Sequence, residues 1–142
     1  MGTASRDGSF ADGDILIVDD YENVREVVSR MLAESGFQVQ TACSGAEALN
    51  LLAESPFGLV LTDFNMPEMD GLTLAAKIKT LSPATPVILM TGADIRTGDE
   101  EKGCVITVLH KPFRWQDLEE AVLTAMTEGR ATYSGEARPQ QQ

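Results

Sequence analysis

The chain has 142 residues, of which 43% are hydrophobic and 23% are charged. A chain of this length and composition buries enough apolar surface for one globular domain, without disulfides or a structural metal. Its eleven basic and twenty-two acidic residues give a net charge of −11, which argues against nucleic acid as a direct partner, because phosphate-backbone affinity depends on Lys and Arg.

The chain contains no segment that resembles a membrane anchor. No apolar stretch approaches the roughly 18 residues of a membrane span, and residues 1–13 lack the apolar core of a signal peptide. We therefore expect a cytoplasmic protein without membrane contact. Residues 1–13 are expected to form a disordered N-terminal arm, and residues 130–142 a disordered C-terminal tail.

Between residues 14 and 129, apolar segments alternate with amphipathic ones. The strand-like segments are 14–19, 37–41, 57–62, 87–90 and 105–109. Apolar residues at helical spacing predict helices over 21–35, 44–54 and 72–81, and from Trp115 to a stop at Gly129. Residues 92–103 are charged and have little apolar periodicity, so they predict a short or frayed helix.

This alternation predicts an α/β fold, a (βα)5 doubly wound five-stranded parallel sheet in a single domain over residues 14–129. The first, third and fourth strands are almost continuously apolar, as strands covered on both faces are. Residues 37–41 alternate between apolar and polar, which fits an edge strand. The pattern is compatible with the flavodoxin-like order 2-1-3-4-5, in which ligands bind beyond the carboxyl ends of the first and third strands.

Polar side chains lie at the end of four of the predicted strands or just past it. They are Asp19 and Asp20 at the end of the first, Asp63 after the third, Thr91 after the fourth and, following His110, Lys111 after the fifth. Because parallel strands end at the same edge of a sheet, we expect the three carboxylates to converge there. From two strands away, only a side chain as long as that of Lys111 can reach them.

Three converging carboxylates repel one another and raise each other's pKa unless a cation intervenes. A hard divalent ion such as Mg²⁺ prefers oxygen ligands and leaves coordination positions open for water or a phosphate oxygen. A carboxylate beside such an ion can attack a phosphoryl group and form an acyl phosphate, while Thr91 and Lys111 neutralise charge on the phosphoryl oxygens. The residues therefore predict a site for a divalent cation and a phosphoryl group.

The chain resembles a two-component response regulator receiver domain of the CheY-like superfamily over residues 14–128. The resemblance rests on Asp19-Asp20, the run from Asp63 to Gly71, Thr91-Gly92 and Lys111-Pro112-Phe113, in this order and at these spacings. It implies a phosphoacceptor domain of a His-Asp phosphorelay that is phosphorylated on Asp63. It also implies that the chain is no enzyme beyond its own phosphorylation and dephosphorylation.

By this resemblance, Mg²⁺, with Mn²⁺ as a substitute, would be bound by Asp20, Asp63 and the backbone carbonyl of Asn65. Asp19 would act on the ion through water. The partner that supplies the phosphoryl group would be a histidine kinase or a histidine phosphotransfer protein. The chain would then act as a single-domain regulator or phosphate shuttle, or as the receiver part of a larger protein such as a hybrid histidine kinase.

The resemblance also implies that Thr91 and Lys111 contact the phosphoryl group, and that the peptide bond between Lys111 and Pro112 is cis. Receivers usually carry Tyr or Phe three positions before this lysine, where the present chain has Val108. The segment from Thr91 to Lys111 is slightly shorter than usual, at 111 − 91 = 20 positions. We therefore hypothesise that the output is an ordering of this loop, or that the domain only relays phosphate.

A downstream protein target would use the face formed by residues 92–103, the fifth strand and the last helix. Three other functions share parts of the pattern. A phosphatase of the haloacid-dehalogenase type would need a second Asp where the chain has Asn65, and a flavin carrier would need a phosphate-binding loop where Asp19 and Asp20 repel phosphate. The main alternative is a degenerate receiver that serves as an interaction module without phosphorylation, although such domains typically lack an acid or the lysine.

Overall fold

The computed structural model describes residues 14–92 and 107–133. In these ranges, five parallel strands form a single sheet with the order β2-β1-β3-β4-β5. The strands are β1 (Asp14–Val18), β2 (Gln38–Ala42), β3 (Leu59–Asp63), β4 (Val87–Thr91) and β5 (Thr107–His110). This order confirms the predicted α/β fold and its flavodoxin-like arrangement.

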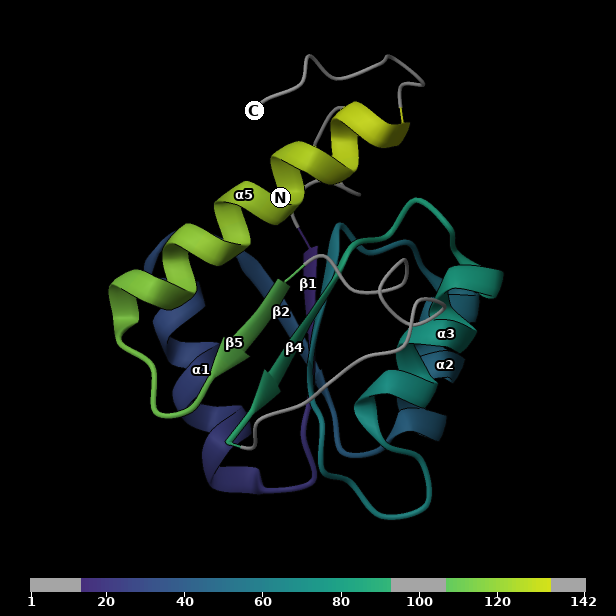
Figure 1. Cartoon of the computed structure of the whole chain (residues 1–142), viewed down its shortest axis with the longest axis horizontal. Helices are drawn as coiled ribbons and strands as arrows, with labels where there is room; N and C mark the ends of the chain where they lie inside the picture. Colours follow the sequence, from purple (N-terminus) through teal and green to yellow (C-terminus); the bar gives the residue numbers. More distant parts are fainter. Residues whose placement is uncertain (1–13, 93–106, 134–142) are drawn as a thin grey trace.

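Helices cover both faces of the sheet (Figure 1). They are α1 (Glu22–Glu34), α2 (Gly45–Glu54), α3 (Gly71–Leu81) and α5 (Trp115–Tyr133). Buried residues of α1 and α5 share one hydrophobic core with the sheet, and those of α2 and α3 share the other. The arrowheads of β4 and β5 in Figure 1 point the same way, so the carboxyl ends of the strands form one edge.

The apolar runs of the sequence arise because the central strands are covered on both faces. Successive side chains of a strand point to opposite faces. Accordingly, Ile15 and Ile17 pack into the core under α1 and α5, while Leu16 and Val18 pack into the core under α2 and α3. All four are fully buried, and each contributes about 1.5–3 kcal/mol through removal from water. By contrast, β2 is an edge strand with exposed polar residues, as its alternation predicted.

Two of the helices begin at side-chain caps that stand just beyond the carboxyl edge of the sheet. Ser44 Oγ accepts a hydrogen bond from the backbone N–H of Glu47 at the start of α2, at 3.1 Å. Asp70 Oδ1 accepts one from the N–H of Thr73 at the start of α3, at 2.8 Å. Each cap satisfies a backbone donor that the first helical turn leaves free. The two caps therefore fix where the loop after β2 and the loop after β3 end.

The predicted helix stop at Gly129 is wrong, because α5 continues to Tyr133. A glycine inside a helix costs about 1 kcal/mol relative to alanine, but it keeps its N–H and C=O for the helical ladder. The predicted tail at 130–142 therefore overlaps the end of the helix. The predicted arm at 1–13, the predicted helix at 92–103 except for Gly92, and the first two residues of the predicted strand 105–109 lie outside the described residues. No helix in the described ranges is both long and apolar enough to cross a bilayer.

The loop between β3 and α3 contains one strained residue. Glu68 is exposed and has a φ of 74°, a left-handed conformation that disfavours most side chains but that Asn tolerates. We expect Glu68→Asn to raise the free energy of unfolding by about 0.5–1 kcal/mol, as measured by urea denaturation. Glu68→Gln, which removes the same charge without relieving the backbone, should leave stability unchanged. Equal stabilisation by both variants would attribute the effect to charge.

Candidate functional site

Three carboxylates meet at the carboxyl edge of β1 and β3. Asp19 directly follows β1, and Asp63 is the last residue of the neighbouring strand β3. One carboxylate oxygen from each of Asp19, Asp20 and Asp63 lies within 4.8 Å of the other two. Asp19 and Asp63 are buried, at 0% and 4% exposure. The structure thus brings together the three acids that the sequence predicted to converge.

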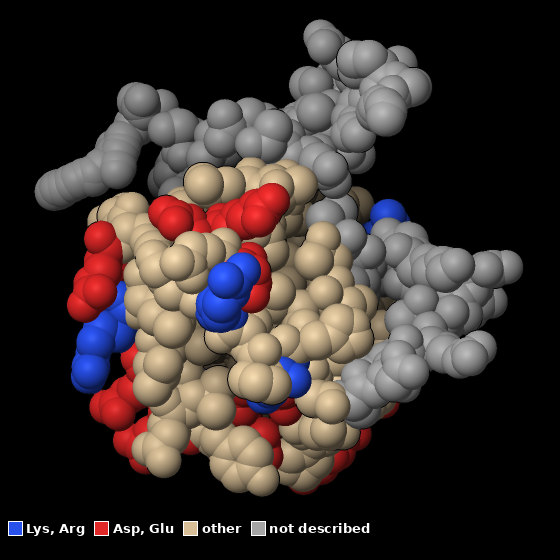
Figure 2. All heavy atoms as spheres, turned by 60° about the vertical axis from the view of Figure 1, so that its left-hand side comes forward, with Lys and Arg blue, Asp and Glu red and all other residues tan. Residues whose placement is uncertain are grey.

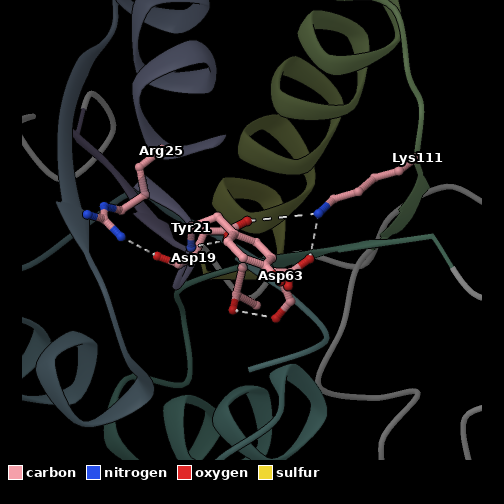
Figure 3. A network of polar contacts seen from close by, with 6 residues as sticks. Asp19, Tyr21, Arg25, Asp63 and Lys111 are labelled. Carbon is pink, nitrogen blue, oxygen red and sulfur yellow. Dashed lines mark hydrogen bonds and ion pairs between the residues drawn. The ribbon is translucent and has the colours of Figure 1, made fainter. Parts of the chain in front are cut away.

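Lys111 reaches this cluster from the end of β5, beyond β4 (Figure 3). It follows β5, which lies two strands from β3, and its Nζ donates a hydrogen bond to Asp63 Oδ1 at 2.8 Å. The same Nζ lies 3.9 Å from Asp19 Oδ2. The side chain of Lys111 is thus long enough to reach the acids, as predicted, and its ammonium neutralises part of the negative charge of the cluster.

The backbone around Lys111 is tied to the end of β4. Its N–H donates to the carbonyl oxygen of Thr91 at 2.7 Å, and its peptide bond to Pro112 is cis, as the resemblance implied. Thr91 is buried at the end of β4. The hydroxyl-bearing residue and the lysine are thus held at the same edge of the sheet as the acids.

The environment of Asp19 determines what the cluster can bind. Burial raises the pKa of Asp19, the hydrogen bond from the Tyr21 N–H at 2.9 Å opposes this rise, and the charge of Asp63 adds to it. Within the described residues, the buried atoms Asp19 Oδ2 and Asp20 Oδ1 have no hydrogen-bond donor. Buried acceptors without donors are costly. A hard divalent cation fits this set of oxygen ligands and would relieve both the repulsion and the missing donors.

The raised pKa gives a prediction for stability. The charged form of Asp19 destabilises the folded state near neutral pH, and stability is gained as the pH falls through its folded-state pKa. We therefore expect Asp19→Asn to raise the free energy of unfolding in EDTA at neutral pH, by an amount on the order of 1 kcal/mol. The amide oxygen can still accept from the Tyr21 N–H.

Urea denaturation with and without Mg²⁺ tests this expectation. A ligand that binds only the folded state stabilises it in proportion to its affinity. Mg²⁺ should therefore stabilise the wild type more than Asp19→Asn. A variant less stable than the wild type in EDTA would show that the Asp19 charge stabilises the fold.

The remaining predicted site residues lie in two different settings. Asn65 is exposed in the loop after β3. Val108 is half-buried on β5, in register with Leu89 of β4.

Two residues with clear contacts at the site were not assigned a role from the sequence. Arg25, on the first turns of α1, donates from Nη1 to the carbonyl oxygen of Asp19 at 2.7 Å (Figure 3). Gly71 begins α3, and a Cβ added there would lie 2.5 Å from the Asp63 carbonyl oxygen and 2.5 Å from Leu89 Cδ1. The sequence offered one sign of each contact. Arg25 is a basic residue one turn into the helix that follows the acid pair, and Gly71 is a glycine directly after the N-cap Asp70.

The absence of a side chain at Gly71 allows α3 to start against the backbone of the acid-bearing strand. The Gly71 N–H donates to the carbonyl oxygen of Phe64 at 2.8 Å, and the Phe64 N–H donates to the carbonyl oxygen of Met90 at 2.8 Å. Through Phe64, these two hydrogen bonds link the start of α3 to β4.

Fold and site together define a doubly wound α/β domain with a candidate cation site, formed by Asp19, Asp20 and Asp63 beside Lys111, at the switch point of its sheet. Residues 15–123 match the family model described as the response regulator receiver domain. The chain belongs to this family, the receiver domains of two-component response regulators. Phosphorylation and Mg²⁺ binding through acidic residues are general features of the family, and its members interact with histidine kinases and phosphotransfer proteins.

Similar proteins include both long and short regulators. The regulatory protein AtoC of Escherichia coli is 40% identical over 114 residues, covering 79% of this chain and 25% of AtoC. The response regulator receiver protein CpdR of Brucella abortus is 36% identical over 106 residues, covering 73% of this chain and 88% of CpdR. The chain spans about a quarter of the length of the first curated relatives it matches, AtoC and the transcriptional regulatory protein ZraR of Salmonella.

Solved structures show the same fold. The response regulator TrrA of Thermotoga maritima, in complex with Mg²⁺ and BeF, has a TM-score of 0.74 at 31% identity, covering 80% of this chain and 98% of that one. A CheY-like receiver domain protein of Methanospirillum hungatei has a TM-score of 0.75 at 32% identity, covering 84% and 98% of the two chains.

Proposed function

We propose that this chain is the phosphoacceptor of a two-component phosphorelay, phosphorylated on Asp63 with Mg²⁺ bound. The observation that carries the proposal is the ion pair of Lys111 with Asp63, at 2.8 Å, inside a cluster whose three acids approach within 4.8 Å. A carboxylate placed among like charges and beside one ammonium is suited to receive an anionic group once a cation has been added.

The proposed reaction is a displacement at phosphorus. A carboxylate oxygen of Asp63 forms a bond to the phosphorus of a phosphohistidine as the bond from phosphorus to the imidazole nitrogen breaks. The imidazole keeps the electron pair of that bond and is the leaving group, and the product is an aspartyl phosphate. Lys111 neutralises charge on the phosphoryl oxygens, and the Thr91 hydroxyl donates to one of them.

In this proposal, Asp20, Asp63 and the Asn65 carbonyl hold the Mg²⁺, with Mn²⁺ as a substitute, and Asp19 acts through water. When bound, the ion supplies charge neutralisation for the acids and for the phosphoryl oxygens. Asp19 Oδ2 and Asp20 Oδ1, the buried oxygens without donors among the described residues, support this assignment.

A groove beside the site supports a protein as the phosphodonor. It lies between α1 and the segment after β5, and its mainly apolar lining includes Val24, Val27, Met31 and Phe113, with Lys111 also on its wall. Val27 is 52% exposed, so this lining is accessible to a partner. A histidine kinase or histidine phosphotransfer protein that covers this groove would bring its phosphohistidine close to Asp63.

The surface charge supports proteins rather than nucleic acids as partners. Acidic side chains are spread over the face shown in Figure 2, whereas basic ones are isolated, in keeping with the net charge of −11. We further propose that the chain acts as a single-domain regulator or phosphate shuttle, or as the receiver of a larger protein. Since Val108 replaces the usual aromatic residue on β5, its output would be loop ordering near the face of β5 and α5, or phosphate relay alone.

Intact-mass spectrometry after incubation with acetyl phosphate tests the proposed function. The wild type should gain one phosphoryl group with Mg²⁺ or Mn²⁺ and none in EDTA. No gain with either ion would favour the alternative, a degenerate receiver that acts as an interaction module.

A further inference from the structure

Arg25 is a half-buried arginine of α1 beside the acidic cluster. Its guanidinium donates to a backbone carbonyl, that of Asp19 at 2.7 Å, rather than to one of the carboxylates. Two other polar groups of Asp19 have hydrogen-bond partners elsewhere in the fold. Its N–H donates to the carbonyl of Ala42 at 3.2 Å, and its Oδ1 accepts from the N–H of Tyr21 at 2.9 Å. Arg25 thus binds the carbonyl oxygen of the peptide unit that joins Asp19 to Asp20.

The contact bears directly on Asp20. Because a peptide unit is planar, fixing the carbonyl oxygen of Asp19 also fixes the N–H and Cα of Asp20. At the Asp20 carboxylate, the buried Oδ1 lacks a donor within the described residues. The backbone at Asp20 therefore sets the position from which its side chain reaches the cluster.

The charge of Arg25 does not explain its position. A positive charge close to a cation pocket repels the incoming cation. The positive charge of Arg25 also acts on Glu47, an acid outside the cluster. The hydrogen bond from the Cys43 N–H is the main cause that lowers the pKa of Glu47, and the charge of Arg25 lowers this pKa further. What remains as a benefit to the pocket is the geometry of the hydrogen bond to Asp19.

We propose that Arg25 is a positioning residue for the cation pocket, which holds the Asp19 carbonyl and thereby orients the Asp20 carboxylate toward Mg²⁺. The inference rests on the proposed function, because it assumes that the pocket binds Mg²⁺. If so, a residue of α1 contributes to the affinity for Mg²⁺ without itself being a ligand. Partners that orient metal ligands in this way typically change affinity about 10–100-fold when they are removed.

Isothermal titration calorimetry with Mg²⁺ alone, at constant ionic strength, tests the inference. Arg25→Met keeps the aliphatic stem and removes the donor, and it should weaken Mg²⁺ binding about tenfold. Arg30→Met is the matched control, because it removes the same charge from an exposed position on the same helix, and it should leave the affinity within about twofold of the wild type. Arg25→Lys keeps one N–H donor on a long side chain. Because Arg25 makes a single hydrogen bond to the Asp19 carbonyl, through Nη1, the lysine variant should keep most of the wild-type affinity for Mg²⁺.

The sign of the change separates the two explanations. If Arg25 acted only through its charge, Arg25→Met would bind Mg²⁺ more tightly than the wild type, and that result would overturn the inference. An unchanged affinity, or no rescue by Arg25→Lys, would overturn it as well. If Arg25→Met does not fold, Arg25→Gln serves in its place, because its amide is too short to reach the carbonyl, and the same weakening is expected.

A second readout distinguishes positioning from general damage. The Mg²⁺ concentration for half-maximal phosphorylation by acetyl phosphate should rise about tenfold in Arg25→Met, with a maximal rate close to that of the wild type. An equal half-saturating concentration and a reduced maximal rate would contradict the inference. A wild type that binds no Mg²⁺ would instead refute the proposed function itself.

Discussion

Asp63→Asn is expected to abolish phosphorylation by acetyl phosphate, with no gain in intact mass even at saturating Mg²⁺. The amide keeps the shape of the side chain at the end of β3 but lacks an anionic oxygen that could form a bond to phosphorus. Because Lys111 lies closest to Asp63, at 2.8 Å against 3.9 Å to Asp19, no other carboxylate of the cluster is expected to take over the reaction.

Asp70→Asn is the matched control for this experiment. It makes the same chemical change at the end of the loop that follows Asp63, and Asn can still cap α3 by accepting from the Thr73 N–H. This variant should be phosphorylated at the wild-type rate. Phosphorylation of Asp63→Asn at an equal rate would contradict the assignment, and peptide mapping of the product would then identify the true acceptor.

Lys111→Met should slow phosphorylation by about 10²–10³-fold at saturating Mg²⁺, the usual effect of removing one group that stabilises a developing anion. Its side chain is 30% exposed at the mouth of the site, and its Nζ is the cationic group that touches Asp63. The rate of mass gain with acetyl phosphate, followed over time, measures the effect.

The binding of Mg²⁺ should respond differently in this variant. Removing the ammonium leaves the three carboxylates of the cluster without a competing cation, so Lys111→Met is expected to bind Mg²⁺ at least as tightly as the wild type. Lys77→Met, which removes an exposed lysine of α3, should change neither the rate nor the affinity. Loss of Mg²⁺ binding in Lys111→Met would indicate that the lysine maintains the architecture of the pocket rather than the chemistry.

The sequence by itself determined the fold and the membership of the acidic cluster. Central strands such as β1 and β3 are buried on both faces, so their apolar runs are visible without any tertiary information. The side chains at their carboxyl ends, including Asp19 and Asp63, must meet because parallel strands end at one edge. The reach of Lys111 followed in the same way from strand order and side-chain length.

Other features depended on how distant segments approach one another. The bond from Arg25 to the Asp19 carbonyl and the lack of space at Gly71 are set by the packing of α1 and α3 on the sheet, which local periodicity does not encode. The same holds for the buried oxygens of Asp19 and Asp20 that lack donors. The helix end was misjudged at Gly129 because a glycine only weakens a helix locally. The parallel sheet and the acid cluster thus follow from local pattern, whereas the contacts that orient the cluster follow from tertiary packing.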